Sequence, residues 1–396
     1  MTELRDIFLT HLAQTSPTPL ALDIVAAESC YLFDRSGKKY LDLVAGLAVN
    51  NVGHRHPKVV EAIKQQADRY LHVIPYGEFV QDPQVRFAPT PTSLLPPAPN
   101  SVYFVTSGTG ATEASLKLAK RATGRTRLIG CRKSYHGSTH GSLSLTDNEE
   151  KKYRNRPLLP DVDHITFNDP GDLSRITTDV AAVVVEPIQG DAGVRVPDKS
   201  WLLALRKCCD DVGALLIFDE VQTGFGRTGK LFAFEHYGVV PDILVLGKAL
   251  GGGMPMGAFV SSRERMHLLT HDPVLGHITT FGGHPIACAA GLAALNALLE
   301  ENMIANSVRM GDLFKQLLVH PQIKGVRSMG LMLAVELGDA DRVQHVVRAC
   351  LDRGVLGFWF LSCPTAFRIA PPLCITEAQV REAISVILEV MNEGKG

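Results

Sequence analysis

The middle of the chain, from about residue 100 to residue 262, alternates short apolar runs with amphipathic stretches. Apolar runs of this kind are typical of strands buried on both faces, and the stretches between them are typical of helices that cover a parallel sheet. The alternation therefore predicts an α/β fold with its core in the middle of the chain. The expected strands are 102–105, 128–131, 164–167, 181–185, 214–218, 243–246 and 258–260.

Two helices are expected between these strands, at 111–122 and 200–212, because Gly124 and Gly213 stand where a left-handed residue would end each of them. After about residue 284 the spacing of apolar residues changes to longer helical periods. We therefore expect a large domain at 51–285 and a smaller α+β domain built from 1–50 and 286–396. In the second part, helices are expected at 287–300, 305–318, 339–353 and 376–391, and strands at 331–335 and 367–369. The proline-rich stretch 86–99 should interrupt a helix.

Composition excludes several classes of protein. The 396 residues carry 40 Lys and Arg against 41 Asp and Glu, a formal net charge of −1, so the chain lacks the positive field that holds a nucleic acid. No stretch approaches the roughly 18 uncharged apolar residues of a membrane span, and the N-terminal segment does not resemble a signal peptide. We expect a cytoplasmic protein. Its 8 cysteines form no CxxC pair and its histidines no zinc pattern, so neither a disulfide framework nor a metal site is expected.

The ends of the expected strands carry the candidate functional residues, because open α/β sheets bind ligands beyond the carboxyl ends of their strands. Residues 106–111 (TSGTGA) form a small-residue turn between a strand and a helix, which could hold a phosphate or be a plain tight turn. Neither nucleotide-binding motif is complete. Glu113 stands at the third glycine of the dinucleotide motif, and Asp242 and Ala249 replace required residues of the P-loop.

Two other strand ends carry charged residues. Asp219 directly follows an apolar strand, where a carboxylate either caps the next turn or meets a positive partner. Lys248 ends the next apolar strand, where it either reaches the surface or stays desolvated as an amine nucleophile. Together with the turn at 106–111, these residues meet the needs of pyridoxal 5′-phosphate: a phosphate anchor, an acid for the ring nitrogen and an amine. Tyr135 could cover the ring.

Along nearly its whole length, the sequence resembles the class III (subgroup II) aminotransferases of the fold type I pyridoxal-phosphate enzymes. This group includes acetylornithine, ornithine and 4-aminobutyrate aminotransferases. The resemblance implies a large, mostly parallel sheet domain with a smaller α+β domain, and transfer of an amino group from an amino acid or ω-amine to a 2-oxo acid. The matching segments are 40–42 (YLD), 53–57 (GHRHP), 106–111, 134–137 (SYHG), 183–190 (VVVEPIQG), 218–230 (FDEVQTGFGRTGK), 246–259 (LGKALGGGMPMGAF), 279–285 (TTFGGHP) and 368–373 (RIAPPL).

The resemblance also implies roles for individual residues. Lys248 would form a Schiff base with the cofactor and then move a proton, while Asp219 would pair with the ring nitrogen. Gln222 would contact the phenolic oxygen and Tyr135 would stack on the ring. Arg368 would grip the substrate carboxylate. Ser107, Gly108 and Thr109 would cup the phosphate, Thr280 would reach it from the neighbouring subunit of a homodimer, and His136, Glu186 and Val221 would complete the cofactor-binding residues.

The substrate side departs from the family pattern. Glu186 and Asp191 take the positions of two acids there, and Asp191 could neutralise Arg368 while an amine without an α-carboxylate is bound. Ser138 stands where members that use dicarboxylates usually carry an arginine, so 2-oxoglutarate is expected as acceptor only if another arginine serves. Two alternatives remain open. One is a racemase or aminomutase with the same cofactor, and the other is a non-catalytic regulator on the same scaffold, which the intact Lys248 argues against.

Overall fold

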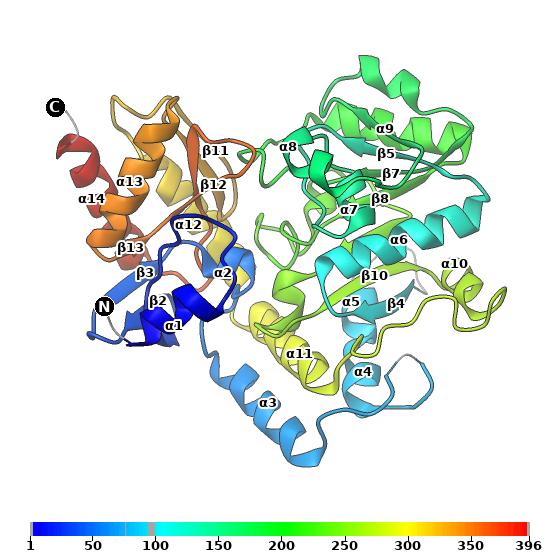
Figure 1. Ribbon diagram of the computed structural model, residues 1–396, viewed down its shortest axis with the longest axis horizontal. Helices are drawn as coiled ribbons and strands as arrows, with labels where there is room; N and C mark the ends of the chain where they lie inside the picture. Colours follow the sequence, from blue (N-terminus) through cyan, green and yellow to red (C-terminus); the bar gives the residue numbers. More distant parts are fainter. Residues whose placement is uncertain (1–2, 76, 94–99, 394–396) are drawn as a thin grey trace.

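A seven-stranded sheet forms the larger lobe of the protein in the computed structural model, which describes residues 3–75, 77–93 and 100–393 (Figure 1). The strand order is β4-β10-β9-β8-β7-β5-β6, and only β10 runs antiparallel to its neighbours. A large, mostly parallel sheet was expected, and the fold class is confirmed. The strands are β4 (Asn100–Val105), β5 (Arg127–Cys131), β6 (Val162–Ile165), β7 (Val180–Val185), β8 (Leu215–Asp219), β9 (Ile243–Leu246) and β10 (Gly257–Ser262).

Helices cover both faces of this sheet because the strand residues alternate between the faces. Ala182 and Val184 of β7 pack in one apolar cluster with α6 (Gly108–Thr123). Val183 and Val185 pack in another cluster with α9 (Lys199–Val212). Both helices end at the glycines that the sequence indicated, with φ of 66° and 69°. The other helices of the larger lobe are α3 (Pro57–Arg69), α4 (Asp82–Phe87), α5 (Pro89–Ser93), α7 (His140–Ser144), α8 (Glu149–Lys152) and α10 (Arg263–His267).

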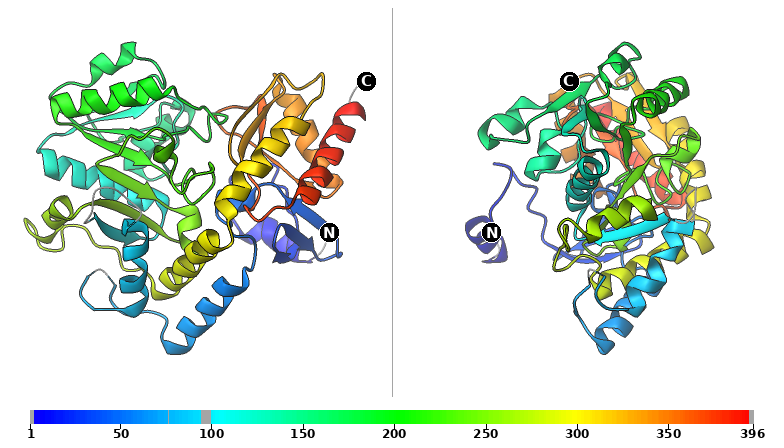
Figure 2. Two further views of the ribbon diagram at one scale, coloured as in Figure 1. Left: turned by 180° about the vertical axis from the view of Figure 1, so that it is seen from behind. Right: turned by 90° about the vertical axis from the view of Figure 1, so that its right-hand side faces the viewer.

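Two four-stranded sheets form the second lobe, where the N-terminal strands lie beside the C-terminal part of the chain. Figure 2 shows the C-terminal segments, coloured orange to red, gathered on one side of the molecule. One sheet contains β1 (Ile24–Glu28), β2 (Tyr31–Asp34), β3 (Lys39–Asp42) and β13 (Val355–Leu356); the other contains β11 (Gly325–Met329), β12 (Met332–Glu336), β15 (Ala366–Ile369) and β14 (Phe358–Trp359). The remaining helices are α1 (Glu3–His11), α2 (Ala45–Ala48), α12 (Met303–Leu317), α13 (Ala340–Asp352) and α14 (Glu377–Glu393), together with α11 (Pro285–Glu300), which packs mainly against α3 and α4 of the larger lobe. The domain boundaries at 50/51 and 285/286 stay a prediction.

Some element boundaries differ from the expected ones. The strand expected at 164–167 is β6 at Val162–Ile165, because the Thr166 N–H turns away to donate to Asp172. The helix expected from residue 111 begins at Gly108, because the Ser107 side chain caps it. In the proline-rich stretch, α4 and α5 flank Ala88, and residues 94–99 lie outside the described part. No helix among the described residues is long and apolar enough to cross a membrane.

Candidate active site

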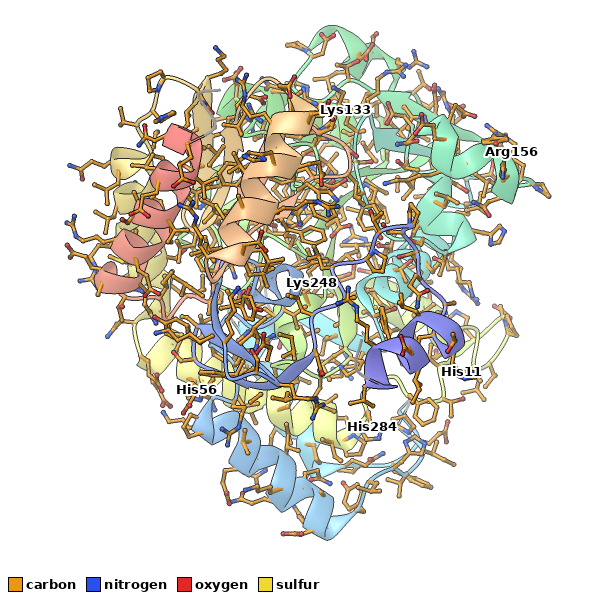
Figure 3. The ribbon with its side chains drawn as sticks, turned by 60° about the vertical axis from the view of Figure 1, so that its left-hand side comes forward. His11, His56, Lys133, Arg156, Lys248 and His284 are labelled. Carbon is orange, nitrogen blue, oxygen red and sulfur yellow. The ribbon has the colours of Figure 1, made fainter. Side chains whose placement is uncertain are left out.

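The predicted site residues gather at one edge of the large sheet. The strands β4, β5, β7, β8 and β9 all point their carboxyl ends to this edge, so the segments that follow them meet there. Figure 3 shows one of these residues, Lys248, near the centre of the molecule in that view. A cavity of about 290 Å³ lies at this edge, lined by Gly108, Thr109, Tyr135, His136, Gly137, Ser138, Glu186, Asp191, Asp219, Val221, Gln222, Thr223 and Lys248.

Glycines allow these segments to approach each other closely. A Cβ atom on Gly108 would lie 2.8 Å from Val221 Cγ1, and one on Gly247 would lie 3.1 Å from the Gly108 Cα. Gly137 has a φ of +126°, and a Cβ there would lie 2.2 Å from Thr109 Oγ1. Side chains at these positions would push the strand exits apart, so the glycines keep the floor and wall of the cavity together.

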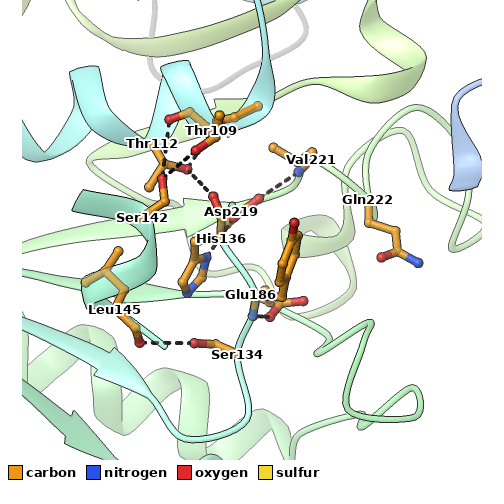
Figure 4. Close-up of polar contacts among 12 residues, drawn as sticks. Thr109, Thr112, Ser134, His136, Ser142, Leu145, Glu186, Asp219, Val221 and Gln222 are labelled. Carbon is orange, nitrogen blue, oxygen red and sulfur yellow. Dashed lines mark hydrogen bonds and ion pairs between the residues drawn. The ribbon is translucent and has the colours of Figure 1, made fainter. Parts of the chain in front are cut away.

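The N-terminus of α6 offers a site for an anion. Ser107 Oγ accepts from the Gly110 N–H at 3.1 Å, and the Ser107 carbonyl accepts from the Ala111 N–H. The N–H groups of Gly108 and Thr109 have no acceptor inside the helix, and the helix dipole adds positive potential at the same place. Thr109 Oγ1 lies 2.8 Å from Ser142 Oγ, a contact visible in Figure 4. A phosphate group fits this end of the cavity.

The carboxylate of Asp219 is held on both oxygens at the end of β8. His136 Nδ1 lies 2.7 Å from Asp219 Oδ2, and the Val221 N–H donates to Oδ1 at 3.0 Å (Figure 4). Burial lowers the pKa of His136, but the hydrogen bond and the charge of Asp219 outweigh this effect, so the net pKa is raised. His136 Nε2 is buried and has no hydrogen-bond partner among the described residues. The pair therefore presents a fixed carboxylate to the cavity.

Lys248 begins a 3₁₀ turn, Lys248–Gly251, directly after β9. Its φ of +46° is unusual for a residue with a side chain. Its Nζ lies 3.4 Å from Gln222 Oε1. Burial, and then repulsion from Arg368, lower the pKa of Lys248 to about 8. The lowered pKa leaves roughly a tenth of this amine unprotonated at pH 7, far more than for an ordinary lysine, and the unprotonated form is the one that attacks a carbonyl carbon.

Glu186, just beyond β7, fixes the loop that carries Tyr135. Glu186 Oε1 accepts from the Tyr135 N–H at 3.0 Å, and Oε2 accepts from the Gly190 N–H at 2.8 Å. Burial raises the pKa of Glu186 to about 7. The Tyr135 hydroxyl lies 3.2 Å from Ser138 Oγ. The aromatic ring and the serine thus lie together at the cavity wall.

Arg368 comes from the second lobe, in the middle of β15. Its Nη2 donates to Asp191 Oδ1 at 3.1 Å, and both side chains are buried. Asp191 also accepts from the Leu361 N–H at 3.1 Å and from Ser362 Oγ at 2.9 Å. The Phe360 ring lies 4.6 Å from the guanidinium. Burial lowers the pKa of Arg368, and its Nε has no partner among the described residues. This cation is therefore neutralised by a partner that a substrate carboxylate could replace.

The structure places most of the predicted site residues on the cavity wall, with three exceptions. Ser107 caps α6 beside the cavity, and Arg368 contacts Asp191, which lines it. Thr280 is exposed and does not line the cavity of its own chain. Its contact with a neighbouring subunit stays a prediction.

Sequence reasoning missed several residues that support the site. Gly137 and Thr223 line the cavity. Glu220 and Arg227 are fully buried charges inside the matching segment 218–230. Glu220 accepts from two backbone N–H groups, and Arg227 donates to the Leu331 carbonyl and to Asn51. The sequence signal for Glu220 and Arg227 is a charged residue within a segment that follows an apolar strand, since a buried charge needs hydrogen-bond partners.

The groups around the cavity complement pyridoxal 5′-phosphate, with an anion site, a carboxylate and an amine opposite its phosphate, ring nitrogen and aldehyde. A mostly parallel sheet with these groups at the carboxyl ends of its strands indicates an enzyme that uses pyridoxal 5′-phosphate. Comparison with known proteins narrows the class to one family. Residues 12–391 match the family model of the class-III aminotransferases, and the chain belongs to that family.

Individual relatives agree with this placement. The chain is 41% identical over 96% of its length to the acetylornithine aminotransferase of Methanopyrus kandleri, of which it covers 96%. It is 40% identical over 92% of its length to the putrescine aminotransferase of Pectobacterium atrosepticum, of which it covers 81%. A structure of the ornithine aminotransferase of Toxoplasma gondii, which holds the cofactor at partial occupancy, matches with a TM-score of 0.92 at 30% identity, covering 99% of this chain and 95% of that one. The protein is a pyridoxal-phosphate-dependent transaminase that uses an amino donor and a 2-oxo acid.

Proposed function

We propose that this transaminase takes its amino group from the end of a carbon chain, as in acetylornithine, ornithine or a diamine. The observation that carries the proposal is the buried ion pair between Arg368 and Asp191. A terminal amine brings no carboxylate to the reacting end, so the guanidinium needs an internal counter-ion while such a donor is bound. When the 2-oxo acid binds, its carboxylate replaces Asp191 on Arg368. The names of the relatives support the same class of donor.

When bound, pyridoxal phosphate supplies an aldehyde carbon that takes up the amino group and a ring that accepts electrons from the bond being broken. Lys248 would hold the aldehyde end through its amine, and the same amine would then move the proton of the substrate carbon. Asp219, held by His136 and the Val221 N–H, keeps the ring nitrogen protonated.

The remaining predicted contacts position the cofactor. Ser107, Gly108 and Thr109 hold the phosphate at the N-terminus of α6. Gln222 and Tyr135 line the cavity, where Gln222 would contact the phenolic oxygen and Tyr135 would cover the ring. Glu186 keeps the Tyr135 loop in place through the backbone N–H. Ser138 sits at the wall on the substrate side.

We further propose a homodimer located in the cytoplasm. Thr280 lies in an exposed segment with Ile278 and Phe281, which expose 48% and 55% of their surface. A second copy that covers these apolar side chains would place Thr280 near the phosphate site of the neighbouring subunit. The domains of each subunit are those expected from the sequence, 51–285 and the combined ends 1–50 and 286–396.

A donor panel tests the proposed substrate class. The purified enzyme is given acetylornithine, ornithine, putrescine, 4-aminobutyrate and alanine as donors, each with pyruvate and with 2-oxoglutarate. We expect the highest kcat/KM with a donor whose reacting amine is terminal. A preference of ten-fold or more, on the order of 1.4 kcal/mol, for the α-amine of alanine over every terminal amine would refute the proposal.

A further inference from the structure

Two cysteine thiols from opposite ends of the chain touch each other in the second lobe. Cys30 Sγ and Cys374 Sγ lie 3.7 Å apart, although the residues are 344 positions apart in sequence. Cys30 lies in the turn between β1 and β2 and is fully buried, while Cys374 lies in the turn between β15 and α14 and is partly exposed. Transamination uses neither thiol.

The backbone around the two thiols is held in register. The Ser29 N–H donates to the His54 carbonyl at 2.9 Å, and the His54 N–H donates back at 2.8 Å. The Leu373 N–H donates to the Asn51 carbonyl at 2.7 Å, which fixes the turn before Cys374 on the same segment. The sulfur contact therefore follows from backbone pairing between both chain ends and the segment 51–54.

The space around Cys374 is unusually tight. Gly53 has a φ of +92°, and a Cβ there would lie 2.8 Å from Cys374 Sγ. Ser29 Oγ lies 3.8 Å from the same sulfur. The absence of a side chain at Gly53 therefore leaves the room that Cys374 Sγ occupies beside Ser29 and Cys30.

One of the two thiols can be reached from solvent. Cys374 lines a cavity of about 510 Å³ together with Asn306, Arg309 and Thr376. Cys30 does not line this cavity and lies behind Cys374. A small reagent can therefore reach Cys374 first. Arg309, Glu301 and Glu377 line the same cavity, so both signs of charge face such a reagent.

The two thiols also differ in acidity. The contact with the Cys30 thiol lowers the pKa of Cys374, and the nearby His54 adds to this effect. The same contact, together with burial, raises the pKa of Cys30. The accessible sulfur therefore loses its proton more readily than the buried one, which is the division between an attacking and a resolving cysteine.

We propose that Cys30 and Cys374 form a dithiol site that exchanges with small disulfides such as oxidised glutathione. The Cys374 thiolate attacks one sulfur of the small disulfide, forms a mixed disulfide and releases one small thiolate. Cys30 then gives its proton to that thiolate and attacks Cys374 Sγ, which releases the second small thiolate. Two protein thiols are oxidised, one small disulfide is reduced, and the new bond closes when the sulfurs approach to about 2.05 Å.

The test is disulfide mapping of the holoenzyme after exposure to oxidised glutathione at neutral pH. After acid quenching and trypsin digestion without reductant, we expect the peptide 6–35 joined to the peptide 369–381, each of which contains one cysteine. Two of the 8 thiols should be lost, and dithiothreitol should restore both. Unlinked peptides, or a link between other cysteines, would overturn the proposal.

Single substitutions separate the two roles. Cys30→Ser should keep glutathione on Cys374 as a mixed disulfide, because the resolving thiol is gone. Cys374→Ser should leave Cys30 unmodified, and Cys208→Ser, a partly exposed cysteine on α9, should form the 6–35 to 369–381 link as the unaltered chain does. Modification of Cys30 in the Cys374→Ser variant would reverse the assigned order and contradict the proposal.

Discussion

Replacing Lys248 by methionine should stabilise the cofactor-free protein. The pKa of Lys248 is lowered from its ordinary value of 10.5 to about 8, chiefly by burial. Below pH 8 the amine is protonated in both the folded and the unfolded protein, so the folded state bears the full cost of the buried charge. This lowering of the pKa corresponds to a loss of about 3 kcal/mol from the free energy of unfolding. The figure is an upper bound, because water enters the cavity when the cofactor is absent. Methionine has a similar length and no charge.

The pH dependence gives this prediction its sign. Between pH 8 and 10.5 the folded protein loses the Lys248 proton while the unfolded chain keeps it, so the original protein gains stability as the pH rises. The advantage of Lys248→Met should therefore be greatest at pH 7 and should shrink toward pH 10.5. The difference in free energy of unfolding is measured at each pH by urea unfolding of both cofactor-free proteins. The two are compared at equal concentration, and unfolding is followed by circular dichroism.

A matched control and a refuting result are available. Lys230→Met removes an exposed lysine from the same matching segment and should leave the unfolding midpoint nearly unchanged at every pH. The two proteins are compared by their free energies of unfolding. If the difference were independent of pH, or grew toward pH 10, the claim that burial lowers the pKa of Lys248 would be refuted.

Three further substitutions test the substrate and cofactor contacts. Asp191→Asn leaves the Arg368 guanidinium without its counter-ion, so kcat/KM for a terminal amine should fall roughly 10- to 100-fold while that for the 2-oxo acid changes much less; equal losses in steady-state kinetics would contradict this. Ser138→Arg should raise the ratio of kcat/KM for 2-oxoglutarate to that for pyruvate by about ten-fold, because the new guanidinium can pair with the distal carboxylate of 2-oxoglutarate. An unchanged ratio would argue against a role for this position. Gly137→Ala places a Cβ against Thr109 Oγ1 and should weaken cofactor binding in a fluorescence titration, whereas unaltered affinity would show that the loop adapts.

The sequence predicted the parts of the fold that depend on local pattern. The strands of the large sheet are nearly continuous apolar runs, because they are buried on both faces. Asp219 and Lys248 could be brought together from sequence because they end neighbouring parallel strands, β8 and β9. Because Ser107 caps α6, the helix begins at Gly108, three residues before the expected start, and this shifted a boundary without moving the site.

Other features depend on contacts that no local pattern encodes. The strand β1 is largely exposed, so it lacks the apolar run that marks a buried strand. The contact of His136 with Asp219 joins residues 83 positions apart, and that of Cys30 with Cys374 joins residues 344 positions apart. Pairings of this kind follow from strand order and from the closure of both chain ends on one lobe, which appear only once the tertiary structure is formed.

The central claim is that Lys248 is the residue that binds the cofactor. The most direct measurement is reduction of the holoenzyme with borohydride, followed by trypsin digestion and mass spectrometry. A cofactor fixed on Lys248 blocks cleavage there, so the peptide 231–263 should appear with the added mass of the reduced cofactor. An unmodified peptide 231–248, with the cofactor on another lysine or on none, would contradict the account.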